Sequence, residues 1–266
     1  MKITIITSTF NCGDLIDKTA RSIRKQTHKD IQWIVVDGMS KDETNYYINL
    51  NINLISNYIQ EVDSGIYDAW NKACNLIIGD WVIFLGAGDT LMDENVLSRI
   101  VEFLKNIPSD VLVVYGNVKV VDEYGKLRYI DAEKKLKKFE YGRPALPNHQ
   151  GVFHARCLFS DSSSLYDSSL KIAGDSKFLL EASRKGKFMY IDIDVSEMIG
   201  GGISNNYKNI FLARNEIALI CNKLDINIPL KYVIKSEFNW IFNYFYNTIT
   251  PKQIKKLVRK LIDLYR

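Results

Sequence analysis

Three aspartates in the first third of the chain each come after a short apolar segment typical of a buried β-strand. Asp37, Asp63 and Asp89 follow residues 31–36, 54–60 and 81–85, respectively. Because the carboxyl ends of parallel strands meet at one edge of a sheet, we expect the three carboxylates to lie at the same edge. Neighbouring carboxylates repel one another, and a fold tolerates them best where a cation or several hydrogen-bond donors are bound. The pattern therefore favours a binding site at this edge.

Asp89 is the candidate metal ligand. It follows the apolar segment 81–85 after Gly86-Ala87-Gly88, three small residues that let a ligand approach the backbone. A lone carboxylate in that place suggests a site for a metal ion and a diphosphate. The alternative is a turn in which Asp89 caps the helix that follows. Position in the sequence does not separate the two.

Strand and helix patterns alternate through the first 90 residues and would position these aspartates. We expect strands at residues 3–7, 31–36, 54–60 and 81–85, and helices at 14–26, from 41–44 onward and at 65–77. Ser40 and Glu43 should form a capping box at the start of the second helix, and Gly79 should end the third. Such alternation predicts an α/β fold with a parallel sheet, helices on both faces and right-handed crossovers.

The alternation breaks after Asp89. We expect helices at 95–104 and 172–185, strands at 110–121, 126–130, 151–159 and 188–193, a turn at 122–125 and a flexible hinge at 200–204. Residues 144–150 form a loop with a proline near each end, rigid enough to present the side chains of His149 and Gln150. This half is predicted to be α+β and to cover one side of the sheet.

Residues 206–266 are more basic than the rest of the chain. They carry 11 Lys and Arg against 4 Asp and Glu, a net charge of +7, whereas the first 205 residues carry 24 against 27, a net charge of −3. We expect helices at 210–224, 230–246 and 251–265. The last has apolar residues on one face and most of its Lys and Arg on the other, so it can lie on an anionic membrane surface. The alternative is that it packs on the domain with a solvated basic face.

The totals exclude several classes of protein. The 266 residues are 47% hydrophobic and 25% charged, as in ordinary globular proteins. The charge of the main part argues against nucleic-acid binding. Four scattered cysteines without a CxxC spacing favour a reduced, cytosolic chain and argue against structural zinc. We expect neither a signal peptide nor a membrane span. The GxGxxG and GxxxxGK[ST] motifs of dinucleotide-binding and P-loop folds are missing.

Taken together, the motifs resemble those of the family 2 glycosyltransferases, inverting enzymes with the GT-A nucleotide-sugar fold. The closest resemblance is to the bacterial branch that assembles capsule, O-antigen or exopolysaccharide repeats. The matching segments are TSTFN (7–11), QWIVVDGMS (32–40) with Asp42 and Thr44, DSGIYDAWNK (63–72), GDWVIFLGAGD (79–89), NHQ (148–150), KIAGD (171–175) and GGIS (201–204). No single segment is specific, but the whole series occurs in the family's order over about the first 205 residues.

The resemblance implies roles for residues that would bind the donor. Thr7, Thr9 and Asn11 would line the nucleotide pocket. Asp37 would accept a hydrogen bond from the base, typically from uracil N3–H, and Asp63 would lie beside the base and ribose. Asn71 and Lys72 would lie near the diphosphate, although Lys72 could instead only form an ion pair with Asp68 one helical turn away.

The resemblance also implies the metal ligand and the catalytic base. Asp89 would be the last residue of the acidic loop that holds Mn²⁺ or Mg²⁺. Here the usual Asp-x-Asp pair is replaced by Gly86 and Gly88, so one protein carboxylate would hold the cation. Asp175 would be the base, and the alternative is a cap at a helix N-terminus. His149 and Gln150 would contact the diphosphate or the acceptor, and the alternative for His149 is a structural residue.

The implied protein is an inverting, metal-assisted glycosyltransferase in surface polysaccharide biosynthesis. It would move sugar from a nucleotide donor, UDP-linked in the simplest case, to a saccharide carried on a polyprenyl lipid at the cytoplasmic membrane face. Residues 1–205 would be the catalytic domain, with a nucleotide-binding half (1–90) and an acceptor half (91–205), and residues 206–266 a helical extension. A nucleotidyltransferase and a catalytically silent nucleotide-sugar-binding scaffold remain as alternatives.

Overall fold

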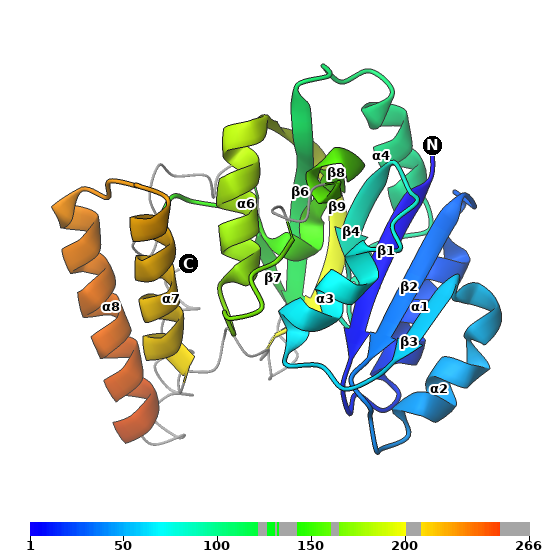
Figure 1. Ribbon diagram of the computed structural model, residues 1–266, viewed down its shortest axis with the longest axis horizontal. Helices are drawn as coiled ribbons and strands as arrows, with labels where there is room; N and C mark the ends of the chain where they lie inside the picture. Colours follow the sequence, from blue (N-terminus) through cyan, green and yellow to red (C-terminus); the bar gives the residue numbers. More distant parts are fainter. Residues whose placement is uncertain (122–126, 131, 133–142, 161–164, 201–208, 251–266) are drawn as a thin grey trace.

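The computed structural model describes residues 1–121, 127–130, 132, 143–160, 165–200 and 209–250. A sheet runs through the middle of the molecule, and helices pack on both of its faces (Figure 1). Its strands are β1 (Ile3–Thr9), β2 (Ile31–Asp37), β3 (Asn57–Gln60), β4 (Trp81–Phe84), β5 (Thr90–Leu91), β6 (Val111–Val121), β7 (Leu127–Ile130), β8 (Val152–Ala155) and β9 (Lys187–Ile199). The helices are α1 (Leu15–Lys25), α2 (Thr44–Leu50), α3 (Ile66–Cys74), α4 (Val96–Leu104), α6 (Gly174–Lys185), α7 (Ile210–Lys223) and α8 (Leu230–Ile249).

The strand order is β3-β2-β1-β4-β8-β6-β9-β5, with β7 paired to β6. β1 pairs in parallel with β2 and β4, and β2 pairs in parallel with β3. β8 is antiparallel to both β4 and β6, and β6 is parallel to β9. The carboxyl ends of β1, β2, β3, β4, β6 and β9 therefore share one edge, which confirms the predicted α/β fold and the parallel first half.

Alternating side chains divide the core between the two faces. Ile6 and Val82 pack in the cluster under α3 and α6, whereas Ile5 and Ile83 pack in the cluster under α1 and α4. All four β4 side chains are buried, as its unbroken apolar run predicted. Since both faces are covered, the loops at the strand ends are the places where polar groups can gather.

Two local predictions are wrong. The capping box does not form, because α2 begins at Thr44 and the Ser40 hydroxyl donates to Asp37 Oδ1 (2.5 Å) instead of capping the helix. Gly79 does not end α3, whose last residue is Cys74. A Cβ on Gly79 would lie 2.5 Å from Thr4 Oγ1, so this glycine is needed for close approach to β1.

Several predicted boundaries shift. The expected strand 151–159 is the shorter β8, followed by a 3-10 helix at Arg156–Phe159, and the expected strand 188–193 is part of the longer β9. The start of the expected strand 54–60 lies in a 3-10 helix at Ile52–Leu54. The predicted turn at 122–125, the hinge residues 201–204 and the helix at 251–265 lie outside the described residues.

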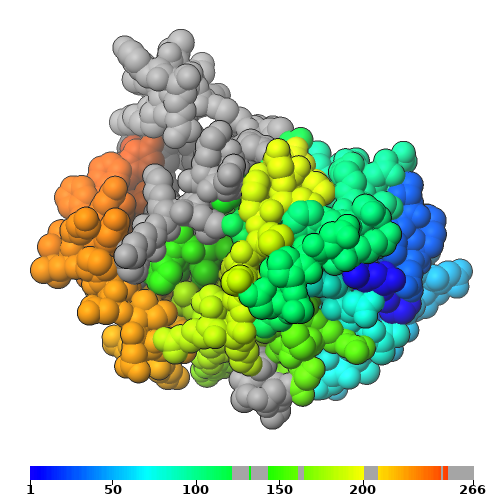
Figure 2. All heavy atoms as spheres, turned by 90° about the horizontal axis from the view of Figure 1, so that it is seen from above, coloured from blue at the N-terminus to red at the C-terminus, as the bar shows by residue number. Residues whose placement is uncertain are grey.

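The C-terminal helices pack in series beside the domain. α7 contacts α6, and α8 contacts α7 at the end of the molecule opposite the N-terminal strands (Figures 1 and 2). Arg214 of α7 and Glu237 of α8 form an ion pair of 2.7 Å between the two helices. Within the part of the chain that the structure describes, no helix is both long and apolar enough to cross a membrane.

Candidate functional site

Asp37 fastens the loop after β2 to the end of β1. Its Oδ1 accepts hydrogen bonds from the hydroxyls of Thr9 (2.8 Å) and Ser40 (2.5 Å), and its Oδ2 accepts one from the Ser40 backbone N–H (2.9 Å). The side chain is fully buried. Gln60 Nε2 also donates to Oδ2 at 3.4 Å, so donors of the protein surround this carboxylate, and in this structure Asp37 and Thr9 hold the loop together. The contact of Asp37 with a base stays a prediction.

Thr7 lies deeper still. It is fully buried in β1, and its hydroxyl accepts a hydrogen bond of 3.0 Å from Trp33 Nε1. Thr7 thus lies in the core below the loop, and its place in a nucleotide pocket stays a prediction. Asn11 is exposed, with a positive φ of 48°, and its Oδ1 accepts from the Lys41 backbone N–H (2.9 Å).

Phe10, Gly38 and Asp63 lie together in the loops that follow β1, β2 and β3. Phe10 is 66% exposed and Asp63 is partly exposed. A Cβ added to Gly38 would lie 2.6 Å from Asp63 Oδ2 and 3.3 Å from Phe10 Cδ2, so the glycine makes room for both side chains. An exposed aromatic ring and a partly exposed carboxylate therefore meet over the buried Gly38 at the carboxyl ends of β1, β2 and β3. We call this set the base slot.

Asp89 closes a tight turn after β4. Its backbone N–H donates to Gly86 O (3.0 Å), and its Oδ2 accepts from the Gly86 N–H (3.0 Å). Thr19 of α1 supports the turn by donating to the Asp89 carbonyl (2.8 Å) and accepting from the Gly88 N–H (3.0 Å). β5 follows directly and α4 begins only at Val96, so the alternative that Asp89 caps the next helix is wrong.

The Asp89 carboxyl fits a cation only in part. The side chain is 7% exposed, and burial raises its pKa to about 7 from the ordinary 3.8, although the backbone N–H groups of Gly86 and Ile199 oppose the shift. Burial removes water from the carboxylate and so favours its neutral, protonated form. No group of three or more His, Cys, Asp or Glu side chains that could hold a metal ion occurs among the described residues. Among the residues that the structure describes, Asp89 therefore has no second or third side chain of these types beside it to share a cation.

Asp175 is the second residue of α6 and lies against α3. It is half-buried, its Oδ1 accepts from the Ser176 N–H (2.6 Å), and the Tyr67 hydroxyl of α3 lies 3.5 Å from the same oxygen. Burial raises its pKa, and the Ser176 N–H and the nearby Arg143 guanidinium counter that effect. The helix N-cap is Ala173, so Asp175 does not occupy the cap position considered as its alternative role.

The loop before Asp175 is held to α3 and to the segment that precedes it. The Tyr67 hydroxyl donates to Ile172 O (2.6 Å), and Lys171 Nζ donates to Ser64 O (2.8 Å) in the loop that precedes α3. A Cβ on Gly174 would lie 2.8 Å from the Tyr67 ring, so this glycine permits the contact. The segment before α6 and the segment before α3 therefore form one packed unit.

Asn71 and Lys72 also face this unit from α3. Asn71 Nδ2 donates to Tyr166 O (2.8 Å), while its Oδ1 is buried without a partner among the described residues. Lys72 Nζ donates to Val62 O (2.7 Å) and lies 3.3 Å from Glu61, closer than the 3.9 Å to Asp68. The i,i+4 pair with Asp68 thus exists, but the stronger contacts place the ammonium beside the loop that carries Asp63.

His149 lies in an aromatic cluster below the loops. It is 7% exposed, its ring stacks on Trp70 with centroids 5.0 Å apart, and its Nε2 is 3.2 Å from the Tyr166 hydroxyl. Burial lowers its pKa to about 3, so the ring is neutral. Contact with a diphosphate or an acceptor would require the ring to leave this stack. Gln150 is half-buried, and its carbonyl accepts from Ser196 Oγ (2.7 Å).

Sequence reasoning missed three residues of this region. Tyr67 and Ser40 lie inside the matching motifs, but the sequence predicts no site role for Tyr67 and only a helix cap for Ser40. Glu216 of α7 is buried and accepts hydrogen bonds from the loop before Asp175. The available signal was a charged residue on the face of a predicted helix that also carries Ala213, Ile217 and Ile220.

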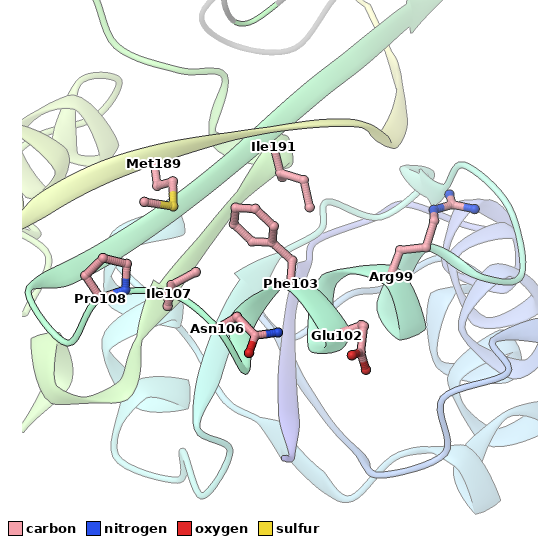
Figure 3. Close-up of a pocket in the computed structure, with 8 residues that line it drawn as sticks. All are labelled: Arg99, Glu102, Phe103, Asn106, Ile107, Pro108, Met189 and Ile191. Carbon is pink, nitrogen blue, oxygen red and sulfur yellow. The ribbon is translucent and has the colours of Figure 1, made fainter.

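A hollow of about 480 Å³ lies elsewhere in the molecule. Figure 3 shows its lining from α4, the segment that follows it and the first part of β9, including Phe103, Pro108 and Met189. β6 and β9 begin at this edge of the sheet, whereas Asp37 and Asp89 lie at the edge where parallel strands end. None of the predicted site residues lines the hollow.

Comparisons with known proteins identify the family of the chain. The family model described as glycosyl transferase family 2 matches residues 4–165, a range that contains Asp37, Asp63 and Asp89 but ends before Asp175. A PGL/p-HBAD biosynthesis glycosyltransferase of Mycobacterium bovis is 38% identical over 164 residues, which are 58% of this chain and 59% of the relative. An uncharacterized glycosyltransferase of Mycobacterium tuberculosis is 29% identical over 189 residues, 68% of each chain. The chain thus spans about three fifths of the length of the first relatives it matches.

Two solved structures share the fold. S. aureus TarS 1-349 superposes with a TM-score of 0.66 at 18% identity, covering 96% of this chain and 77% of that one. The mannosyltransferase PcManGT from Pyrobaculum calidifontis, solved with GDP-Man and Mn²⁺, gives a TM-score of 0.67 at 13% identity, covering 99% of this chain and 80% of that one. TarS has also been solved with UDP-GlcNAc.

Proposed function

This chain belongs to glycosyl transferase family 2, and we propose that it is an inverting enzyme that moves a sugar from a nucleoside diphosphate to a saccharide acceptor. The observation that carries the proposal is the position of Asp175. It is a half-buried carboxylate with a raised pKa, next to Tyr67 of the helix that follows the donor-side loop. A raised pKa makes a carboxylate a better proton acceptor near neutral pH.

The chemistry needs one base. The acceptor hydroxyl attacks C1 of the donor sugar from the face opposite the leaving group, and its proton passes to the Asp175 carboxylate. The bond between C1 and the phosphate oxygen breaks, and its electron pair leaves with the nucleoside diphosphate. Because attack and departure occur on opposite faces in one displacement, the configuration at C1 inverts without a covalent intermediate.

The base slot would recognise the nucleotide. The exposed Phe10 ring offers a stacking face, and the Asp63 carboxylate over Gly38 offers an acceptor. Uracil carries a donor at N3, whereas cytosine carries an acceptor there that a carboxylate would repel. We therefore expect UDP to bind more tightly than CDP, with Asp37 holding the loop that forms the slot.

Asp89 would hold Mn²⁺ or Mg²⁺ together with the diphosphate of the donor. The single carboxylate and the absence of acidic residues at Gly86 and Gly88 leave the other positions to diphosphate oxygens and water. When bound, the cation would stabilise the negative charge that develops on the leaving group. Lys72, held beside the loop of Asp63, would add positive charge on the same side.

The acceptor would be a saccharide on a lipid carrier at the inner face of the cell membrane, in surface polysaccharide biosynthesis. α8 exposes a stripe of large apolar side chains that recur every three or four positions, namely Leu230, Ile234, Phe238, Ile241, Phe242, Phe245 and Ile249. The segment 206–266 carries a net charge of +7. An apolar stripe within a basic segment suits an anionic lipid surface.

Membrane binding is tested by sedimentation with anionic and neutral vesicles. We expect binding to the anionic vesicles only, weakened in Phe238→Ser and unchanged in Tyr46→Ser, since Tyr46 is an exposed aromatic of α2 at the other end of the chain. If vesicles of neither composition bind and Phe238→Ser instead converts a dimer to a monomer, the stripe contacts a second copy and the membrane assignment is wrong.

The donor assignment is tested by calorimetric binding of UDP, GDP, dTDP and CDP with and without Mn²⁺, followed by turnover of the matching nucleotide sugars. We expect UDP to bind, Mn²⁺ to tighten binding, and Asp63→Ala to remove it. Asp175→Asn should retain UDP binding and lose turnover. Binding without turnover in the wild type would favour the catalytically silent alternative, and no binding of any nucleotide would refute the donor site.

A further inference from the structure

Glu216 is a buried carboxylate in the middle of α7. Its side chain is 5% exposed and meets three consecutive backbone N–H groups of the loop before α6. Oε1 accepts from Lys171 (2.7 Å), while Oε2 accepts from Ile172 (2.9 Å) and Ala173 (2.8 Å). Both oxygens are therefore used, and every partner belongs to the segment that leads into Asp175.

A carboxylate in this place is informative because apolar packing alone would not select it. Burying a charged group is costly unless donors compensate for the lost water, and here three backbone N–H groups do so. α7 also buries Ile220 and Cys221, so apolar contacts lie beside the carboxylate. The carboxylate thus adds a directed connection between α7 and one loop.

The same loop is held from the opposite side by the donor half of the molecule. The Tyr67 hydroxyl donates to Ile172 O, and Lys171 Nζ donates to Ser64 O. One carbonyl of the loop is therefore bound by α3 and the Lys171 side chain by the segment before α3, whereas three N–H groups of the loop are bound by α7. Removal of Glu216 would leave the buried N–H of Ala173 and the part-buried N–H groups of Lys171 and Ile172 without this acceptor, and the loop would lose its contact with α7.

We propose that Glu216 is a positioning residue for the transfer reaction: by holding the N–H groups of residues 171–173 it sets the place and direction of the Asp175 carboxylate. The inference rests on the proposed function, because it assumes that Asp175 takes the proton of the acceptor. It follows that α7, which lies outside the residues matched by the family model, is part of the catalytic unit. Cutting the chain after residue 205 would remove that support.

The first measurement is hydrogen exchange of the amides of residues 171–173 in the full chain without ligands. We expect their exchange to become at least about tenfold faster in Glu216→Ala, because the acceptor is gone. Glu216→Gln should lie between, since its carbonyl oxygen can serve two N–H groups while its amide nitrogen faces the third. Glu237→Gln is the matched control, because it weakens the ion pair with Arg214 on the same helix pair and leaves the loop untouched.

The second measurement is steady-state turnover of the nucleotide sugar identified by the binding experiment. Glu216→Ala should lower kcat about tenfold or more while the donor KM and the UDP affinity stay within about twofold, because only the base is displaced. Glu216→Gln should recover part of kcat, and Glu237→Gln should match the wild type. If Glu216→Ala does not fold, Glu216→Gln carries the same test, because it has the same shape.

The outcomes separate this inference from the proposed function. A wild type that turns over no donor refutes the proposed function, and the inference falls with it. Faster exchange with an unchanged kcat shows that Glu216 only holds the loop, and overturns the positioning role. Unchanged exchange of the amides of residues 171–173 in Glu216→Ala also overturns the positioning role. A loss of UDP affinity in Glu216→Ala as large as its loss of kcat overturns it too, because the change would then affect donor binding and not only the base. Faster exchange with lower kcat and unchanged donor KM supports it.

Discussion

Replacing Asp89 by asparagine should change how the stability of the protein depends on pH. Burial raises the pKa of the Asp89 carboxyl to about 7, against an ordinary value of 3.8. Because the folded protein holds this proton more tightly than the unfolded chain, the contribution to stability is fully present below about pH 4. It is lost as the pH rises through the folded pKa, since the carboxylate must then be buried as a charge.

The size of the effect follows from the difference between the two pKa values. Each pKa unit corresponds to about 1.4 kcal/mol, so a difference of about three units gives at most about 4 kcal/mol. Roughly 2–3 kcal/mol of this falls between about pH 5 and pH 8. Asparagine is neutral throughout, so the free energy of unfolding of Asp89→Asn, relative to the wild type, should increase by that amount over this range.

Urea unfolding of the ligand-free protein in chelator, at about pH 5 and about pH 8, measures the difference. The control is Asp93→Asn, because Asp93 is exposed, pairs with Arg99 at 2.8 Å and has a lowered pKa, so its charge is the same at both pH values. If the free energies of unfolding of Asp89→Asn and the wild type differ by the same amount at both pH values, the reasoning is refuted. UDP with Mn²⁺ should then stabilise the wild type at the higher pH and leave Asp89→Asn almost unchanged.

Three further predictions concern the two halves of the site. Burial raises the pKa of Asp175, and the kcat of the wild type should fall as the pH is lowered through this pKa, because only the ionised carboxylate accepts a proton. A pH–kcat profile without this fall at low pH would exclude Asp175 as the base. Gly38→Ala should weaken UDP binding about tenfold in calorimetry, because its Cβ would lie 2.6 Å from Asp63 Oδ2 and displace the carboxylate, and unchanged affinity would remove Asp63 from the base slot. Gly174→Ala should lower the free energy of unfolding by about 1–3 kcal/mol and also lower kcat, because the added Cβ would lie 2.8 Å from the Tyr67 ring. A variant with unchanged stability and kcat would contradict the close packing of Gly174 against Tyr67.

The first half of the fold could be predicted because its signals are local. Each buried strand is a continuous apolar run and each helix has a regular apolar face, so β1, β2 and β4 were located to within a few residues. The capping box failed for a reason outside its own segment. The Ser40 hydroxyl donates to the Asp37 carboxylate, which also accepts from Thr9 of another strand, and is therefore not available to cap the helix.

The sequence was sufficient to predict at which edge of the sheet the site lies, but not which contacts each of its side chains makes. Topology brings Asp37, Asp63 and Asp89 to the same edge, and the sequence is sufficient for that step. Whether each carboxylate faces a ligand or the protein depends on partners distant in sequence. Asp37 proved to be fully buried, whereas Asp63 is partly exposed above Gly38. The link from Glu216 to the loop before Asp175 spans 43 to 45 residues, beyond the reach of any spacing rule.

A site with a single carboxylate has a consequence for how the donor would bind. Burial raises the pKa of Asp89 to about 7, so near neutral pH a cation alone would compete with a proton for this carboxylate and would gain one protein carboxylate as ligand. With the diphosphate present, the same cation gains phosphate oxygens, and the nucleotide gains a partner for its charge. Linkage requires that each then strengthens the binding of the other by the same factor. On the proposed function, metal and donor should therefore bind as a pair, and the pair should bind more tightly as the pH rises through about 7, because the carboxylate is then free of its proton.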